Sequence, residues 1–253
     1  MNAQRREDIA RKIAAAGRYR SFRGATVLEI GADKEGISAR MLADAGAARV
    51  ISANTLEGWP ERKEGAIEWR RLDARCIDRD FEPESLDIIF GVAILEHIHG
   101  LDRFFAGAKH ALRGDGMLFA HGGPIWTSAN GHHVGLLIDG QSYRFGNRAL
   151  NPVRDWTHLA LSRSEMVEDL AARDVPRAHA EAIAQQIYES ENCNRVGYRA
   201  MREAFDGSGL GEIERIENAF AMPPPELLAA IERGPYGDQQ RYDVSGITFV
   251  ARR

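Results

Sequence analysis

The chain has 253 residues, of which 44% are hydrophobic and 28% charged, and its formal net charge is −4. These proportions are typical of a folded globular protein and exclude a disordered or collagen-like chain. A net charge near zero gives no reason to expect nucleic acid or an anionic membrane as the main partner. Two cysteines, Cys76 and Cys193, are too few for a disulfide framework or a metal cluster. They fit a reducing cytoplasm, where we expect the protein to reside.

Membrane and export segments are also not expected. The first twelve residues carry several charged side chains and lack the apolar stretch of a signal peptide. The longest apolar run, 88–95, is far shorter than the roughly 20 residues that span a bilayer.

The first half of the chain alternates between strand and helix patterns. After a surface helix over 2–17, short apolar runs predict five strands, and apolar residues four positions apart predict helices between them. The predicted strands are 25–30, 49–53, 67–72, 86–92 and 117–121, and the predicted helices include 37–46 and 101–113. This alternation is typical of a mostly parallel sheet with helices on both faces.

The pattern changes after His121. Residues 122–160 are rich in Gly, His, Trp and Asn, which indicates loops, and 163–206 are mostly helical. Two further strands, 212–220 and 244–251, with a short helix over 224–233 between them, complete a predicted seven-stranded sheet. We therefore expect one α/β domain over 1–253, with a mainly helical cap inserted over 122–211 above the strand ends.

The segment after the first strand is the most informative one. Residues 27–36 are Val-Leu-Glu-Ile-Gly-Ala-Asp-Lys-Glu-Gly, a strand that runs into a glycine-bearing turn before a helix. A dinucleotide-binding turn needs glycine at positions 31, 33 and 36. Position 33 is aspartate instead, and its carboxylate would obstruct and repel a pyrophosphate. A cationic cofactor without phosphate, such as S-adenosylmethionine, suits this acidic turn.

This segment resembles the first motif of the class I S-adenosylmethionine-dependent methyltransferases, hydrophobic-hydrophobic-Glu-hydrophobic-Gly-x-Gly-x-Gly, over 27–31. Further matches follow in the family's order at 72–74, 86–98 and 112–118, so that the resemblance covers 24–121 and 212–253. It implies a Rossmann-like fold and S-adenosylmethionine as the cofactor. The chain departs from the family at 33 and 35, where the second and third glycines of the motif are acidic here.

The resemblance also implies which side chains hold the cofactor. Asp73 is expected to accept a hydrogen bond from the adenine amino group, and Glu29 to anchor the loop around the amino acid end. Asn54 stands where the family usually has an acidic residue, and its amide could still hold the ribose hydroxyls. The full set expected at the cofactor is Glu29, Gly31, Ala32, Asp33, Gly36, Asn54, Asp73, Ala74, Gly91 and Val92.

Six of the eight histidines lie between positions 97 and 133. Imidazole is the side chain best suited to proton transfer near neutral pH. His97 follows the fourth strand, where the transferred methyl group is expected, and His132 and His133 lie in a loop that could close over a substrate. These three are the candidate catalytic bases. No metal is expected, because the Glu-x-x-Glu-His pattern of some related enzymes has Ala93 in place of its first glutamate.

The expected function is methyl transfer to a small molecule, with no nucleic acid and no membrane as partner and with the oligomeric state open. Catalysis would come mainly from orientation and the exclusion of water. Two alternatives keep the cofactor and change the chemistry. One is a lyase or cyclase that cuts S-adenosylmethionine itself and releases methylthioadenosine, and the other is a non-catalytic module that binds the cofactor without turnover.

Overall fold

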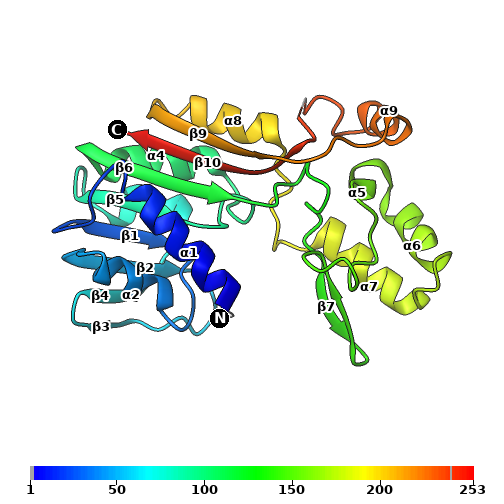
Figure 1. Cartoon of the computed structure of the whole chain (residues 1–253), viewed down its shortest axis with the longest axis horizontal. Coiled ribbons are helices and arrows are strands. Elements are labelled where there is room, and N and C mark those ends of the chain that lie inside the picture. Colours follow the sequence, from blue (N-terminus) through cyan, green and yellow to red (C-terminus); the bar gives the residue numbers. More distant parts are fainter. Residues whose placement is uncertain (1–2, 240) are drawn as a thin grey trace. The chain divides into compact units, whose positions relative to one another are not determined.

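A computed structural model of the chain describes residues 3–239 and 241–253 (Figure 1). The chain divides into two compact units. The first takes the chain up to Gly122 together with Glu203–Ile216 and Thr248–Arg253, and the second takes Gly123–Arg202 and Glu217–Ile247. The cap predicted over 122–211 overlaps the second unit, and its role as a cover of the strand ends stays a prediction.

An eight-stranded sheet, in the order β3-β4-β2-β1-β5-β6-β10-β9, is the main element of the fold. The neighbours from β4 to β6 are parallel, as the alternation of strands and helices predicts, and β3 is antiparallel to β4. The strands are β1 (Thr26–Ile30), β2 (Arg49–Asn54), β3 (Arg62–Glu64), β4 (Ile67–Arg71), β5 (Leu86–Gly91), β6 (Leu112–Gly122), β9 (Gly211–Ala219) and β10 (Val244–Arg252).

The prediction of seven strands is wrong by one. The additional strand, β3, consists of the three exposed residues Arg-Lys-Glu at one edge of the sheet. A strand without an apolar residue has no alternation of hydrophobic and polar positions, so periodicity could not reveal it.

Helices of the first unit cover both faces of the sheet. They are α1 (Ala3–Ala16), α2 (Ile37–Asp44), the 3-10 turn η1 (Ala74–Cys76), α3 (Ile77–Asp80), α4 (Leu101–Ala111) and the end of α8 (Tyr198–Asp206). On one face, α1 and α2 share a buried cluster with Val27, Phe90 and Val250. On the other face, Phe249 of β10 packs against Phe105 of α4 and Phe205 of α8, with ring centroids 5.6 and 4.3 Å apart.

The register of the central strands aligns their carboxyl ends. Ile30 of β1 is level with Ala53 of β2 and with Gly91 of β5, and Gly91 is level with Ala120 of β6. All these strands are almost fully buried, as expected for parallel strands covered on both faces. Ligands of such sheets bind beyond this edge, so the residues that follow it form the candidate site.

The second unit consists of α5 (Thr157–Ala160), α6 (Arg163–Ala171), α7 (Arg177–Glu189), α9 (Pro225–Arg233) and the hairpin of β7 (Gly135–Ile138) and β8 (Gln141–Arg144). These elements surround a separate core that includes Trp126, Leu170, Ile183 and Ile231. The hairpin turns at Asp139-Gly140, both at positive φ, which is the two-residue turn that suits twisted strands. The prediction of loops throughout 122–160 therefore missed this hairpin and the short helix α5.

Among the described residues, no helix combines the length and the apolar character that crossing a lipid bilayer requires.

Candidate functional site

Three glycines at the carboxyl ends of neighbouring strands make room for one loop. A Cβ added at Gly31 or at Gly91 would lie 2.4 Å from side-chain atoms of Ile94, and one added at Gly122 would lie 2.6 Å from the Cβ of Leu95. Real Cβ atoms essentially never come within 3.0 Å of another heavy atom. The loop between β5 and α4 therefore lies directly against the ends of β1, β5 and β6, and the packing of Ile94 gives Gly31 and Gly91 a structural role.

This loop is held by His121 at the end of β6. The Ala93 N–H donates to Nδ1 of His121 (3.3 Å), and the Ile94 N–H donates to the His121 carbonyl oxygen (3.0 Å). Burial, with a smaller contribution from Lys12, lowers the pKa of His121 to about 4. The ring is therefore neutral near pH 7, and Nδ1 is free of a proton and able to accept. Ala93 is held at φ 55, a left-handed conformation that costs a residue other than glycine about 1 kcal/mol or more.

The turn between β1 and α2 is organised by Asp33. Its carboxylate accepts hydrogen bonds from the N–H groups of Ile37 and Ser38 (both 3.0 Å), at the N-terminus of α2. Burial alone would raise the pKa of Asp33, but these bonds and the Ser38 hydroxyl (2.8 Å) outweigh burial and lower it. A helix N-terminus is the usual place for a phosphate group. Here the protein's own carboxylate already occupies that place.

Glu29 lies on β1 beneath this turn and is 3% exposed. The Ser38 hydroxyl lies within hydrogen-bond distance of both the Glu29 and the Asp33 carboxyl groups, so that one serine links Glu29 with the turn. Burial raises the pKa of Glu29 to about 7, although the neighbouring hydroxyls of Ser38 and Ser52 act in the opposite direction. Near neutral pH the carboxyl group is therefore divided between its neutral and its charged form, and a nearby cation would favour the charged form.

Glu29→Gln is expected to abolish one component of the pH dependence of stability. Because the folded-state pKa, about 7, is above the usual 4.5, the folded protein holds a proton that the unfolded chain loses. Wild-type stability therefore falls as pH rises from about 4.5 to 7 and then levels off. Relative to Glu29→Gln, we expect the wild type to lose about 2–3 kcal/mol of unfolding free energy between pH 5 and 8.

Urea unfolding at pH 5, 6, 7 and 8 measures this difference. Glu61→Gln is the matched control, because Glu61 is exposed, and it should keep the wild-type slope. The same slope in Glu29→Gln and the wild type would contradict the assignment.

Asn54 and Asp73, expected at the ribose and the adenine, are both engaged within the protein. The Asn54 amide donates to the Ala32 carbonyl (2.8 Å) and accepts from the Leu56 N–H (3.1 Å), which joins the ends of β1 and β2. Asp73 caps η1 and pairs with the Arg75 guanidinium (2.6 Å), whose hydrogen bonds lower the pKa of Asp73. A bound ribose or adenine would have to share these groups with their present partners.

The other residues expected at the cofactor lie at the same edge. Gly36 is the N-cap of α2 at φ 63, and an added Cβ would lie 3.0 Å from the Trp69 ring, so both the backbone and the packing favour glycine there. Ala74 begins η1 and is buried, whereas Val92 is partly buried against the core. The structure thus brings most of the predicted set to one edge of the sheet, and their contact with a cofactor stays a prediction.

The three candidate bases belong to different units. His97 lies in the first unit, is partly exposed, and has its Nε2 4.0 Å from the Glu96 carboxylate. His132 and His133 lie in the second unit and are buried. Nδ1 of His132 accepts from the Val134 N–H (3.2 Å), and burial lowers the pKa of His132 well below its usual value. The His133 ring donates to the Gly131 carbonyl (2.7 Å). Their catalytic role stays a prediction.

Two residues of this site were not expected from the sequence. Ser38 links Glu29 and Asp33, and Ile94 covers Gly31 and Gly91. A carboxylate close before a helix is favourable at the helix N-terminus, so Asp33 could have indicated contact with the first N–H groups of α2. No local pattern points to Ile94, because its contacts depend on the register of strands far apart in the sequence.

Comparison with solved structures identifies the fold. The chain is similar to an S-adenosylmethionine-dependent methyltransferase from Mesorhizobium loti, with 15% identity, a TM-score of 0.54 and coverage of 96% of this chain and 98% of that one. A second similar structure, from Archaeoglobus fulgidus, has 11% identity, a TM-score of 0.53 and coverage of 98% and 94%. A third, geranyl diphosphate methyltransferase in complex with S-adenosylmethionine, has 13% identity, a TM-score of 0.52 and coverage of 97% and 85%.

No family model and no curated protein sequence matches the chain. At these identities the structural likeness shows the fold, and the chain has the α/β fold of the S-adenosylmethionine-dependent methyltransferases. This confirms the fold expected from the motifs at 27–31, 72–74 and 86–98. Fold alone does not determine chemistry, which has to be argued from the site.

Proposed function

We propose that the chain is an S-adenosylmethionine-dependent methyltransferase that acts on a small molecule. The observation that carries this proposal is the Asp33 carboxylate on the N–H groups of Ile37 and Ser38. A diphosphate cofactor would meet a carboxylate where it needs free N–H donors. A cofactor without phosphate and with a positive charge fits the same turn, and the fold belongs to enzymes that use such a cofactor.

When bound, S-adenosylmethionine supplies an activated methyl group to a nucleophile. In this proposal Glu29, with Ser38, fixes the turn and provides a negative charge for a cationic ligand. Asp73 and Asn54 hold the adenosine part, and Ile94 provides an apolar surface over Gly31 and Gly91. A hydroxyl or amine acceptor must lose a proton as it takes the methyl group, and His97 is the candidate to receive it.

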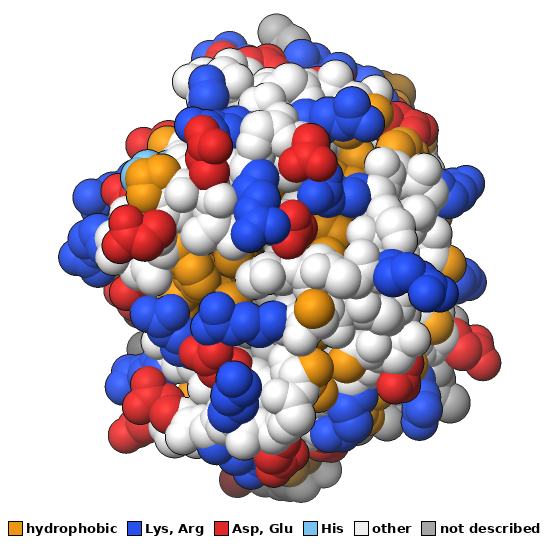
Figure 2. Space-filling view, turned by 90° about the vertical axis from the view of Figure 1, so that its left-hand side faces the viewer, with side chains coloured by type: hydrophobic (Ala, Val, Ile, Leu, Met, Phe, Trp, Pro, Cys, Tyr) orange, Lys and Arg blue, Asp and Glu red, His pale blue; other side chains and the backbone are white. Residues whose placement is uncertain are grey.

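One observation supports a small acceptor. On the face drawn in Figure 2, basic and acidic side chains are interspersed, and no continuous basic stripe of the kind that binds nucleic acid is visible there. Cys76 and Cys193, both among the described residues, form no disulfide, which supports the cytoplasm as the compartment.

One alternative is favoured by a specific observation. Because Asn54 and Asp73 are already engaged within the protein, a weak or non-catalytic cofactor site is the second candidate. A module of this kind would bind the cofactor without converting it. A lyase or cyclase differs from both the methyltransferase and the non-catalytic module in its product, methylthioadenosine.

Isothermal titration with S-adenosylmethionine, S-adenosylhomocysteine and NAD tests the cofactor. We expect both adenosyl compounds to bind and NAD to give no heat. Binding of NAD instead, or of none of the three, would end the proposal.

Incubation with S-adenosylmethionine, with and without a panel of small hydroxyl, amine and carboxylate acceptors, then tests the chemistry. We expect S-adenosylhomocysteine to form only when an acceptor is present. Methylthioadenosine without acceptor would identify a lyase, and binding without any turnover a non-catalytic module.

A further inference from the structure

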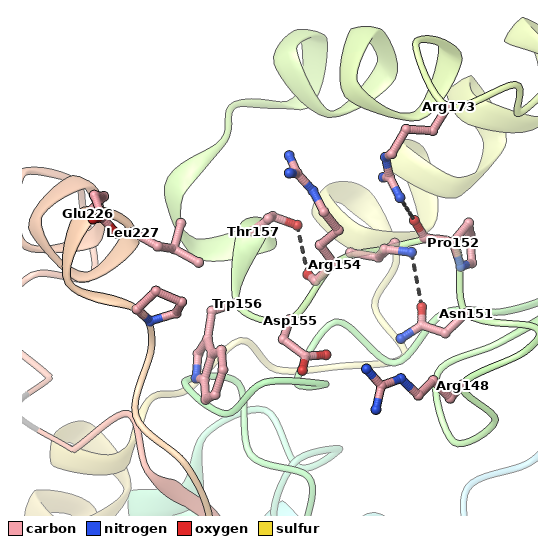
Figure 3. A pocket seen from close by; sticks show the side chains of 12 residues that line it. Arg148, Asn151, Pro152, Arg154, Asp155, Trp156, Thr157, Arg173, Glu226 and Leu227 are labelled. Atoms are coloured by element: carbon pink, nitrogen blue, oxygen red, sulfur yellow. Dashed lines mark hydrogen bonds between the residues drawn. The ribbon is translucent and has the colours of Figure 1, made fainter.

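The pocket of the second unit has features of a binding site in its own right. The segment 148–157 forms most of its wall, and Arg173 and the start of α9 complete it (Figure 3). Its volume of about 620 Å³ is sufficient for a small molecule. Its apolar surface comes from Val153, Trp156 and Leu227 among others, and its polar groups are mainly charged.

The wall is fixed although most of it has no regular secondary structure. Arg173 donates to the Pro152 carbonyl (2.7 Å) and to the Asp169 carboxylate (2.6 Å), which ties the segment to α6. Within the segment, the Val153 N–H donates to the Asn151 side chain (3.1 Å), and the Thr157 hydroxyl donates to the Arg154 carbonyl (2.8 Å). A wall formed in advance lowers the ordering cost of binding.

The backbone of Trp156, in this wall, is strained. Its φ is 60, in the left-handed region that a bulky residue rarely adopts. The backbone N–H donates to the Ala129 carbonyl (3.0 Å), and the indole Nε1 donates to the Tyr242 carbonyl (2.9 Å). Strain that the surrounding structure enforces at a cavity is a recognised sign of a functional site. The hydrogen bonds fix the indole in its place in the pocket wall.

Three arginines and two carboxylates line the pocket, and they are unevenly paired. Arg154 and Arg173 share the single carboxylate of Asp169. Across the described parts of the chain, 3–239 and 241–253, Arg148, Asp155 and Glu226 have no ion pair. The pocket thus offers a guanidinium group and carboxylates that no neighbouring residue neutralises. In the view of Figure 3, the Arg148 guanidinium and the Asp155 carboxylate are drawn near each other.

We propose that this pocket binds a small zwitterion, an α-amino acid or a molecule with the same adjacent ammonium and carboxylate groups. The Arg148 guanidinium receives the carboxylate through paired hydrogen bonds, and Asp155 receives the ammonium group. An apolar side chain of the ligand lies against Trp156 and Leu227. A ligand with only one charge would leave Arg148 or Asp155 without its partner and would face a like charge as well. The proposal does not depend on methyl transfer.

Titration of the full chain, without any cofactor, tests this site. The probes are L-leucine and L-phenylalanine, their N-acetyl derivatives, their amides, and inorganic phosphate, each up to about 10 mM so that millimolar binding is detected. We expect one of the free amino acids to bind, and its N-acetyl and amide forms to bind at least about tenfold more weakly, the loss that one unmatched charged group causes.

Two variants assign the contacts. Arg148→Gln should weaken the free amino acid about tenfold but not its amide, which no longer faces a like charge. Asp155→Asn should likewise weaken the free amino acid but not the N-acetyl form. Arg144→Gln, an exposed arginine of the same unit outside the pocket, should bind as the wild type does. S-adenosylhomocysteine carries the same adjacent ammonium and carboxylate groups, so only the binding of it that persists in both variants is assigned to the strand ends.

Several outcomes would overturn the proposal. The first is that phosphate or a singly charged analogue binds as strongly as the amino acid. The second is that both pocket variants bind the amino acid with wild-type affinity. The third is that neither L-leucine nor L-phenylalanine binds. Because no cofactor is present, a failure here is separate from a failure of the proposed function.

Discussion

His121→Ala is expected to weaken the binding of S-adenosylhomocysteine at least about tenfold, if the cofactor occupies the strand ends as proposed. The substitution removes the acceptor of the Ala93 N–H. A lost partner of this kind costs about 1–3 kcal/mol, and tenfold in affinity corresponds to about 1.4 kcal/mol. Ala93 is also held in a left-handed conformation that costs about 1 kcal/mol or more when support is lost. Ile94 would then leave its position against Gly31 and Gly91, and the surface of the crevice would change.

Two further variants separate positioning from general damage. His121→Asn places an oxygen near the position of Nδ1 and should keep affinity within about threefold of the wild type, because the hydrogen bond is restored. Ala93→Gly, introduced into His121→Ala, removes the strain and should recover part of the lost affinity. Calorimetric titration measures the affinities, and thermal unfolding shows whether each variant is folded. Equal losses in His121→Asn and His121→Ala would contradict the role of Nδ1.

The same bond gives a pH dependence with a definite sign. Because burial lowers the pKa of His121 to about 4, the unfolded chain takes up a proton on this ring before the folded protein does. The stability that neutral His121 contributes is therefore complete above about pH 6.5 and is lost as pH falls toward 4. His121→Asn should lack this component of the acid sensitivity.

Gly131→Ala is expected to lower the free energy of unfolding by about 3 kcal/mol or more, the largest stability effect we predict. An added Cβ would lie 2.2 Å from the Trp126 carbonyl oxygen and 2.4 Å from that of Ile125. Neither oxygen can move away easily, because the His158 ring donates to the Trp126 carbonyl (2.8 Å) and the Trp126 side chain is fully buried. Urea unfolding, followed by tryptophan fluorescence, measures the loss.

Gly146→Ala is the matched control in the same unit, since an added Cβ there meets no atom within 4 Å. It should change stability by less than about 0.5 kcal/mol. A Gly131→Ala protein as stable as this control would show that the loop of 124–134 can rearrange at little cost.

Hydrophobic periodicity was enough to predict the parallel strands and most helices, because each of them buries a continuous apolar run or face. It failed at β3, which is charged throughout, and at the hairpin of β7 and β8. In the hairpin the turn signal Asp139-Gly140 was present in the sequence, although the strands beside it bury few residues.

The chemistry of the site was only partly visible in the sequence. An acidic turn at Asp33 was evident, and a carboxylate close before a helix is favourable at the helix N-terminus. The raised pKa of Glu29 requires full burial, and the hydrogen bond from Ala93 to His121 requires β5 and β6 to be neighbours. Both depend on tertiary packing, which a single sequence does not display.

The Asp33 carboxylate accepts hydrogen bonds from the first N–H groups of α2. These groups therefore have partners before any ligand binds. Binding and release of a ligand then require no unfolding or refolding of that helix. The entropy cost of ordering it is therefore not part of the binding free energy. Exchange of spent cofactor for fresh cofactor would proceed over a surface that is already in its final shape.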